Sequence, residues 1–212
     1  MNIPEAQPMT HRTPERDQLD ACCQQQAREF LGMMRAGGHL PPPAHLPTLS
    51  AAQLAPSLNT LGDTLTGQAL AWEKLAPSAP AVRHYSNGLL YCGLMLAQLH
   101  RLAPDPLHAL TAFSTWAASF MRDVLTENGY SEGEAVRAVD DLDSGPAQLL
   151  AALGRLPDDR ARGAFMAAYS SSHAGPHALT VSGSPEALGA YFTAAGVALG
   201  ATGTPLGGGL QA

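Results

Sequence analysis

The sequence predicts an all-α protein, a single-domain bundle of seven or eight helices around a central antiparallel helical hairpin, 81-102 and 105-127. Apolar residues recur every three or four positions through most of the chain, which is the helical period. No Asp, Glu, Lys or Arg occurs from His84 to His100 or from Pro106 to Met121. Because a helix without charge has little to present to water, both halves of the hairpin should lie deep in the fold or in an interface.

The first element follows a polar N-terminal segment, 1-14, which is expected to be disordered and lacks the apolar run of a signal peptide. The helical domain then covers 15-202. Its first helix starts near Pro14, ends at Gly37-Gly38 and shows one apolar stripe: Leu19, Cys23, Ala27, Phe30 and Met34. Three successive prolines in 39-48 favour an extended, polyproline-type strap across the surface.

The second helix begins at a capping box formed by Ser50 and Gln53 and continues to Leu75. Pro56, close to its first turn, predicts a kink or a restarted helix. The central hairpin follows, and its second helix is capped by Asp105 with Pro106 at the first position. That helix has two apolar faces, so we expect it to be sandwiched between neighbours until Asn128-Gly129 ends it.

The remaining elements are shorter. A second capping box, Ser131 to Glu134, opens a helix, and a break at 143–146 restarts the chain. Another helix starts at 157–159, followed by a looser stretch, 170–183, in which residues 177–181 form one short extended piece. A last helix starts at Ser184-Pro185-Glu186, and the Gly-rich tail, 203-212, should be flexible.

Charged residues make up 14% of the chain, against roughly a quarter in typical soluble domains. This deficit suggests surface covered by a second subunit. A net charge of -6, a single lysine and scattered arginines do not favour nucleic-acid binding, which needs clustered positive charge. The nearest cluster, Arg155, Arg160 and Arg162, is interleaved with Asp158 and Asp159 and is typical of a solvated helix start.

Cys22, Cys23 and Cys92 form an odd set without CxxC spacing, which predicts a reduced, cytoplasmic protein with three small buried thiols. From Gly163 to Ala212 the only formally charged residue is Glu186. The final helix should therefore pack into the bundle or form a subunit interface, and no Lys or Arg is present to anchor it in a membrane. The predicted interface residues are Leu188, Tyr191, Phe192, Gly196, Leu199 and Gly200.

Histidines flank the central hairpin. His100 and His108 are close enough in the predicted turn to converge. In an apolar or haem-like cofactor site, His100 or His108 would be the ligand and Trp116 would be part of the wall. The alternative is that both histidines cap helix ends, and that the aromatic residues are core. His173 and His177 have the spacing of two metal ligands on a helix, but Gly175-Pro176 argues against a continuous helix there, so no metal is predicted.

No catalytic constellation appears in the sequence. The leading prediction is a non-enzymatic helical protein that acts by protein-protein association, as a structural, adaptor or regulatory component and as a homodimer without a cofactor. A helical bundle that binds an apolar small molecule or haem-like cofactor, possibly as an enzyme, is the alternative. DNA binding through arginines assembled from two subunits is the third hypothesis.

Overall fold

The computed structural model describes residues 14–37, 51–75, 80–144 and 146–180. Within these residues there are seven α-helices, one short 3₁₀ turn and no strand, which confirms the predicted all-α class. The elements are α1 (Pro14–Ala36), α2 (Ala51–Leu75), α3 (Pro80–Leu102), α4 (Pro106–Glu127), α5 (Glu132–Asp140), η1 (Asp141–Ser144), α6 (Pro146–Arg155) and α7 (Asp159–Thr180).

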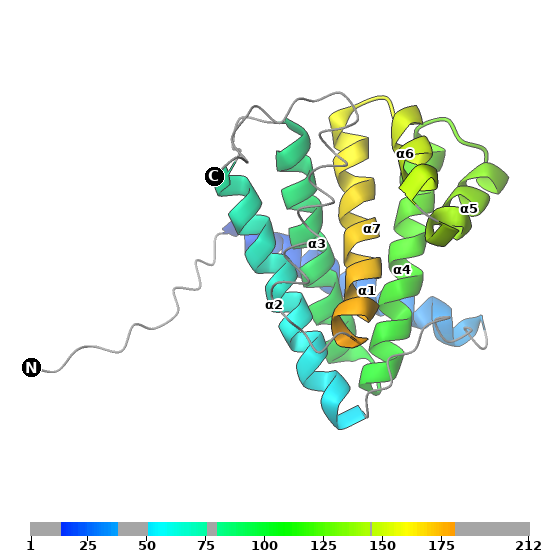
Figure 1. Ribbon diagram of the computed structural model, residues 1–212. Helices are drawn as coiled ribbons and strands as arrows, with labels where there is room; N and C mark the ends of the chain where they lie inside the picture. The colour runs from blue at the N-terminus through cyan, green and yellow to red at the C-terminus, as the bar shows by residue number, and fades with distance from the viewer. Residues whose placement is uncertain (1–13, 38–50, 76–79, 145, 181–212) are drawn as a thin grey trace, which may run out of the picture.

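Four long helices run along the bundle, in the order α2, α3, α7 and α4 across Figure 1, and α1 crosses behind them. The predicted hairpin is present as α3 and α4. It is joined most extensively by α2 on one side of α3 and by α7, which packs against both α3 and α4. Helices α5 and α6 lie beside the upper end of α4 (Figure 1). Between Arg83 and Arg101, near its two ends, α3 therefore has neighbours on several sides, which explains why residues 84–100 carry no Asp, Glu, Lys or Arg.

The helix ends follow local capping chemistry. The Asp105 side chain accepts a hydrogen bond from the His108 backbone N–H, 2.9 Å away, and Pro106 occupies the first turn of α4. At the other end, Gly129 has φ +94°, the Gly129 N–H donates to Thr126 and the Tyr130 N–H donates to Leu125, the Schellman pattern. The predicted capping box between Ser131 and Glu134 opens α5.

Helices α3 and α7 approach each other closely at small residues. A Cβ placed on Gly163 would lie 2.7 Å from the Tyr85 backbone nitrogen and 2.7 Å from the His84 Cβ. One turn further along, a Cβ on Gly88 would lie 2.5 Å from the Cβ of Ala167. Gly163 meets residues 84 and 85, and Ala167, four residues later in α7, meets Gly88, four residues later in α3. The two helices therefore run parallel. Hydrogen in place of a side chain at these two positions is what lets the backbones meet.

Buried hydroxyl groups accompany this contact. The Tyr85 hydroxyl donates to the Ser170 Oγ at 3.2 Å, and the Ser171 hydroxyl donates to the Ala167 carbonyl at 2.7 Å. Both serines are fully buried. On the opposite side of α3, the Ser86 hydroxyl donates to the Ala69 carbonyl of α2 at 2.5 Å. Each of these hydroxyls thus has a partner, which offsets the cost of burying it.

Two predictions about α7 are wrong. The stretch expected to loosen at Ser170 is helical to Thr180, and Gly175-Pro176 lies inside the helix, so residues 177–180 are not extended. Burial of residues 165–171 against α3 and α4 outweighs the local preference of Gly and Pro to end a helix. Likewise α2 passes through Pro56 without restarting, because a proline near the helix start removes few backbone hydrogen bonds.

Several sequence predictions lie outside the described residues. These are the disordered N-terminal segment up to residue 13, the proline-rich strap, the last helix and the Gly-rich tail. The predicted interface residues of the last helix, from Leu188 to Gly200, belong to the same part of the chain and stay predictions.

Candidate functional site

An aromatic cluster lies where α3 and α4 pack together. Phe113, Trp116 and Phe120 follow one face of α4 because they are three and four residues apart. The Trp116 and Phe120 rings are stacked with centroids 5.5 Å apart, and Phe113 stacks on Trp116 at 5.8 Å. Tyr91 of α3 meets Trp116 and Phe120 edge-on, at 5.4 and 5.7 Å. The four rings of this aromatic cluster pack against one another, face to face or edge to face.

Helix α1 closes the cluster on its outer side through polar contacts. The Tyr91 hydroxyl donates to the Gln26 side-chain carbonyl, which draws α1 onto α3. Nearby, the Gln98 amide nitrogen donates to the Asp20 carboxylate at 2.7 Å, and Arg101 donates to the Gln98 amide oxygen at 2.5 Å. Gln98 is only 6% exposed, so these two bonds satisfy an amide that would otherwise be costly to bury.

The acid–base properties of this region are those of a structural contact. Burial raises the pKa of Tyr91 to about 12, against a weaker lowering effect of the hydrogen bond to Gln26. Burial also raises the pKa of the Cys23 thiol and of the Cys92 thiol to about 12. At neutral pH these groups are protonated, and protonated thiols are poor nucleophiles.

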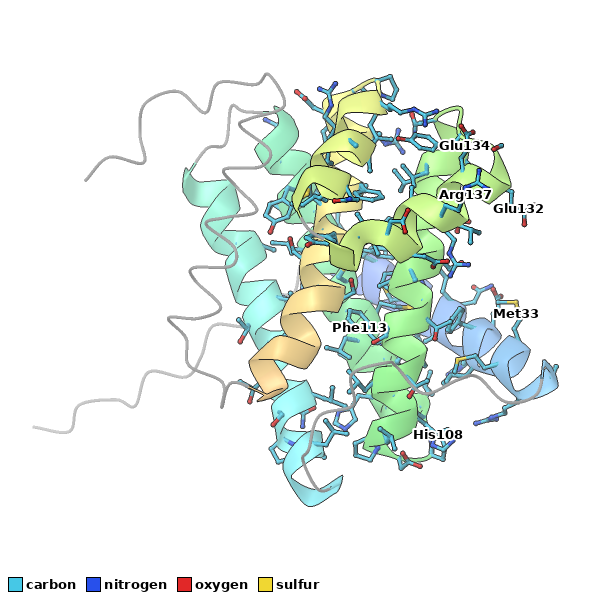
Figure 2. All side chains as sticks on the ribbon, turned by 45° about the vertical axis from the view of Figure 1, so that its right-hand side comes forward. Met33, His108, Phe113, Glu132, Glu134 and Arg137 are labelled. Carbon is cyan, nitrogen blue, oxygen red and sulfur yellow. The ribbon has the colours of Figure 1, made fainter. Side chains whose placement is uncertain are left out.

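The predicted cofactor-binding residues do not share a described contact. The His100 Nδ1 lies 3.0 Å from the Asn59 side-chain oxygen on α2, whereas the His108 Nδ1 lies 2.6 Å from the Asp105 carboxylate. Trp116 belongs to the aromatic cluster. Figure 2 shows His108 at the foot of α4 and Phe113 further along the same helix. Each residue is thus engaged with a neighbour of its own, and the cofactor site stays a prediction.

The cysteines require one correction. Cys23 and Cys92 are buried, as predicted, but Cys22 is exposed on the outer face of α1. Adjacent residues of a helix point about 100° apart, so a helix that buries Cys23 necessarily turns Cys22 away. All three thiols are free.

Arg155 and Arg162, near the start of α7, contact acidic and aromatic partners. The Arg155 guanidinium lies 3.8 Å above the Tyr130 ring and 3.7 Å from the Glu134 carboxylate. Arg162 pairs with Asp159 at 3.4 Å, and Asp158 accepts a hydrogen bond from the Ala161 N–H at the helix start. A carboxylate therefore occupies the end of α7 at which an anion would bind.

An apolar edge is formed where α1 continues past α4. Figures 1 and 2 both show the C-terminal end of α1 extending beyond the bundle, and Figure 2 shows Met33 on this overhang. Met33 is 64% exposed, and Phe30 and Met34 are half-buried beside it. We call these three residues the α1 edge. The outer face of α1 is otherwise mostly polar, so the α1 edge is a local feature.

Within the described residues no group of three His, Cys, Asp or Glu side chains is arranged to hold a metal ion. None of the described helices is long and apolar enough to cross a membrane. No protein family model, curated protein or solved structure matches this chain. The candidate functional site is therefore the region where α1 crosses α3 and α4, with the aromatic cluster, the polar contacts and the α1 edge.

The sequence analysis did not identify most of this region. Asp20 and Gln26 lie on the same side of α1 as the apolar stripe. Gln98 is a polar residue among the buried apolar residues of α3. A polar residue on an otherwise buried face is a signal of a buried hydrogen bond, because such a group needs a partner. That signal was present at Gln98, although the sequence does not show which residue pairs with it.

Proposed function

We propose that this protein acts by association with a second copy of itself, as a structural, adaptor or regulatory component, without catalysing a reaction. One observation supports this proposal most directly: α1 continues past the bundle and exposes Met33 beside the half-buried Phe30 and Met34. Methionine adapts its shape readily and is common at surfaces that bind other proteins. A second subunit placed on the α1 edge would remove these side chains from water.

Composition supports the same proposal. With 14% charged residues, the chain has few groups to keep its surface solvated, and a dimer needs less such surface per chain than a monomer. The predicted interface in the last helix, centred on Gly196 and Gly200, is a second surface for the dimer. Three free cysteines are consistent with the cytoplasm, where thiols stay reduced.

Size-exclusion chromatography with light scattering tests the proposal on the full chain. We expect a mass of about 44 kDa, twice the 22.1 kDa of one chain. A mass of one chain at micromolar concentration would contradict the proposal.

Three variants then identify the surface. Met33→Glu and Gly196→Glu each add one negative charge to a proposed contact, and we expect each to weaken dimerisation about tenfold or more, because a charge would be buried without a partner. Gln18→Glu adds the same charge on the exposed face of α1 and serves as the control. If all three variants dimerise like the wild type, neither surface forms the dimer.

A further inference from the structure

Helix α1 is held less firmly than the helices it covers. Among the described side chains, α1 buries three apolar residues, Cys23, Ala27 and Leu31, whereas α3 buries seven: Tyr85, Leu89, Cys92, Leu94, Met95, Leu96 and Leu99. Burial of apolar surface stabilises in proportion to its area. The separation of α1 from the bundle therefore costs much less than the unfolding of α3.

Leu19, Phe30 and Met34 add half-buried apolar contacts, and the side-chain hydrogen bonds between α1 and α3 are of a kind that water can replace. Asp20 accepts from Gln98, and Gln26 accepts from Tyr91. When α1 leaves, all four groups can bond to water, so each hydrogen bond opposes separation only weakly. Contacts between parts of one chain that are polar in this way resemble transient interfaces. Such an element opens on its own, without unfolding of the rest.

The surface beneath α1 is specific for this helix. It consists of Tyr91, Gln98 and the apolar surface between α3 and α4, and we call it the α1 seat. The Tyr91 hydroxyl donates a hydrogen bond to Gln26, and the Gln98 amide donates one to Asp20. The spacing of these two donors on α3 therefore corresponds to the spacing of the two acceptors on α1. Any copy of this chain carries an α1 with the same match, so α1 of a second copy fits the seat as well as the chain's own.

The connection to α2 permits such an exchange. Thirteen residues, 38–50, separate the described ends of α1 and α2. A segment of this length reaches at most roughly 45 Å when fully extended. That distance exceeds the length of α1 itself, which is roughly 35 Å for a helix of 23 residues. In addition, the α1 edge already lies beyond α4.

We propose that α1 is an exchangeable segment and that the α1 seat binds α1 of a second copy of this chain. Exchange of an identical element between two copies forms a closed dimer from contacts that already exist within one chain. This inference rests on the proposed homodimer and adds the exchanged α1 as a contact between the two copies besides the α1 edge, since Met33 is exposed when α1 occupies a seat.

A peptide that corresponds to residues 14–36, labelled with fluorescein, tests the inference on the full-length protein. We expect its fluorescence anisotropy to rise to saturation, and light scattering to show that the dimer becomes a complex of one chain with one peptide. Two control peptides carry the same charge change. Ala27→Arg places arginine at a fully buried position and should bind more than about tenfold more weakly, whereas Gln25→Arg lies on the exposed face and should bind like the unchanged peptide.

The results separate this inference from the proposed function. A dimer that keeps its mass and binds no peptide overturns exchange of α1, while the homodimer stands. A chain that is monomeric without peptide overturns both. Hydrogen exchange of the unmodified protein gives an independent test: we expect the amides of α1 to exchange at least tenfold faster than those of α3, and equal rates would also overturn the inference.

Discussion

Helices α3 and α7 meet so closely at Gly163 that a methyl group has no room there. In Gly163→Ala the new Cβ would lie 2.7 Å from the Tyr85 backbone nitrogen and 2.9 Å from the His84 carbonyl carbon. Because these are backbone atoms, they cannot turn aside as a flexible side chain does, and the two helices must separate. Overpacking of this kind costs about 1–3 kcal/mol, while alanine in a helix regains up to about 1 kcal/mol relative to glycine.

We therefore expect Gly163→Ala to lower the free energy of unfolding by about 2 kcal/mol, which for a chain of this size lowers Tm by roughly 4–8 °C. Thermal unfolding followed by far-ultraviolet circular dichroism measures this. The matched control is Gly67→Ala in α2, where no atom lies within 4 Å of the new Cβ. It should raise Tm slightly, by the helix preference of alanine alone. A Gly163→Ala variant as stable as the wild type would refute the close approach of α3 and α7.

Three further predictions concern the side chains around the candidate site. With a thiol reagent, one cysteine per native chain, Cys22, should react quickly, and Cys23 and Cys92 should react only on unfolding, because burial raises the pKa of each to about 12; fast reaction of all three would contradict the packing of α1. The His108 backbone N–H holds the pKa of Asp105 below its ordinary value of 3.8, so its stabilisation is complete above that value and is lost as the pH falls through the folded-state pKa. Wild type should accordingly lose stability relative to Asp105→Asn as the pH falls towards and below 3.8 in urea titrations, and parallel curves would refute this. Adding haemin should leave its Soret band unchanged, because His100 and His108 contact different neighbours and Trp116 is packed among other aromatic rings, so the three residues do not line one site; a shifted band would instead favour the cofactor hypothesis.

The helix boundaries could be predicted from the sequence because capping is local. Asp105 with Pro106, and Ser131 with Glu134, each complete their hydrogen bonds within four residues, so their roles depend little on the rest of the fold. The same holds at Gly129, where a positive φ favours glycine. The burial of α3 was also predicted, because residues 84–100 carry no Asp, Glu, Lys or Arg.

Predictions that depend on distant partners were less successful. The helical course of α7 beyond Ser170 opposes the local preferences of Gly175 and Pro176, and it is supported by contacts with α3, including the Tyr85–Ser170 hydrogen bond. The residue pattern of α7 alone cannot show which residues of another helix will stabilise α7. For the same reason the polar contacts between α1 and α3 were not predicted, although each partner is visible in the sequence.

The glycines at close helix contacts show why the partner of a helix is hard to predict from the sequence. Gly196 and Gly200, four residues apart, are predicted to lie in a helix contact, and among the described residues Gly163 and Ala167 of α7, also four apart, contact α3 closely. The spacing indicates that a helix can approach another closely, and it leaves the partner open. Since α3 is surrounded by helices of its own chain, its lack of charge reflects burial in the bundle and is not evidence for a dimer. The proposed association therefore depends on α1 and on the segment that contains Gly196, and the variants at Met33 and Gly196 test these two surfaces separately.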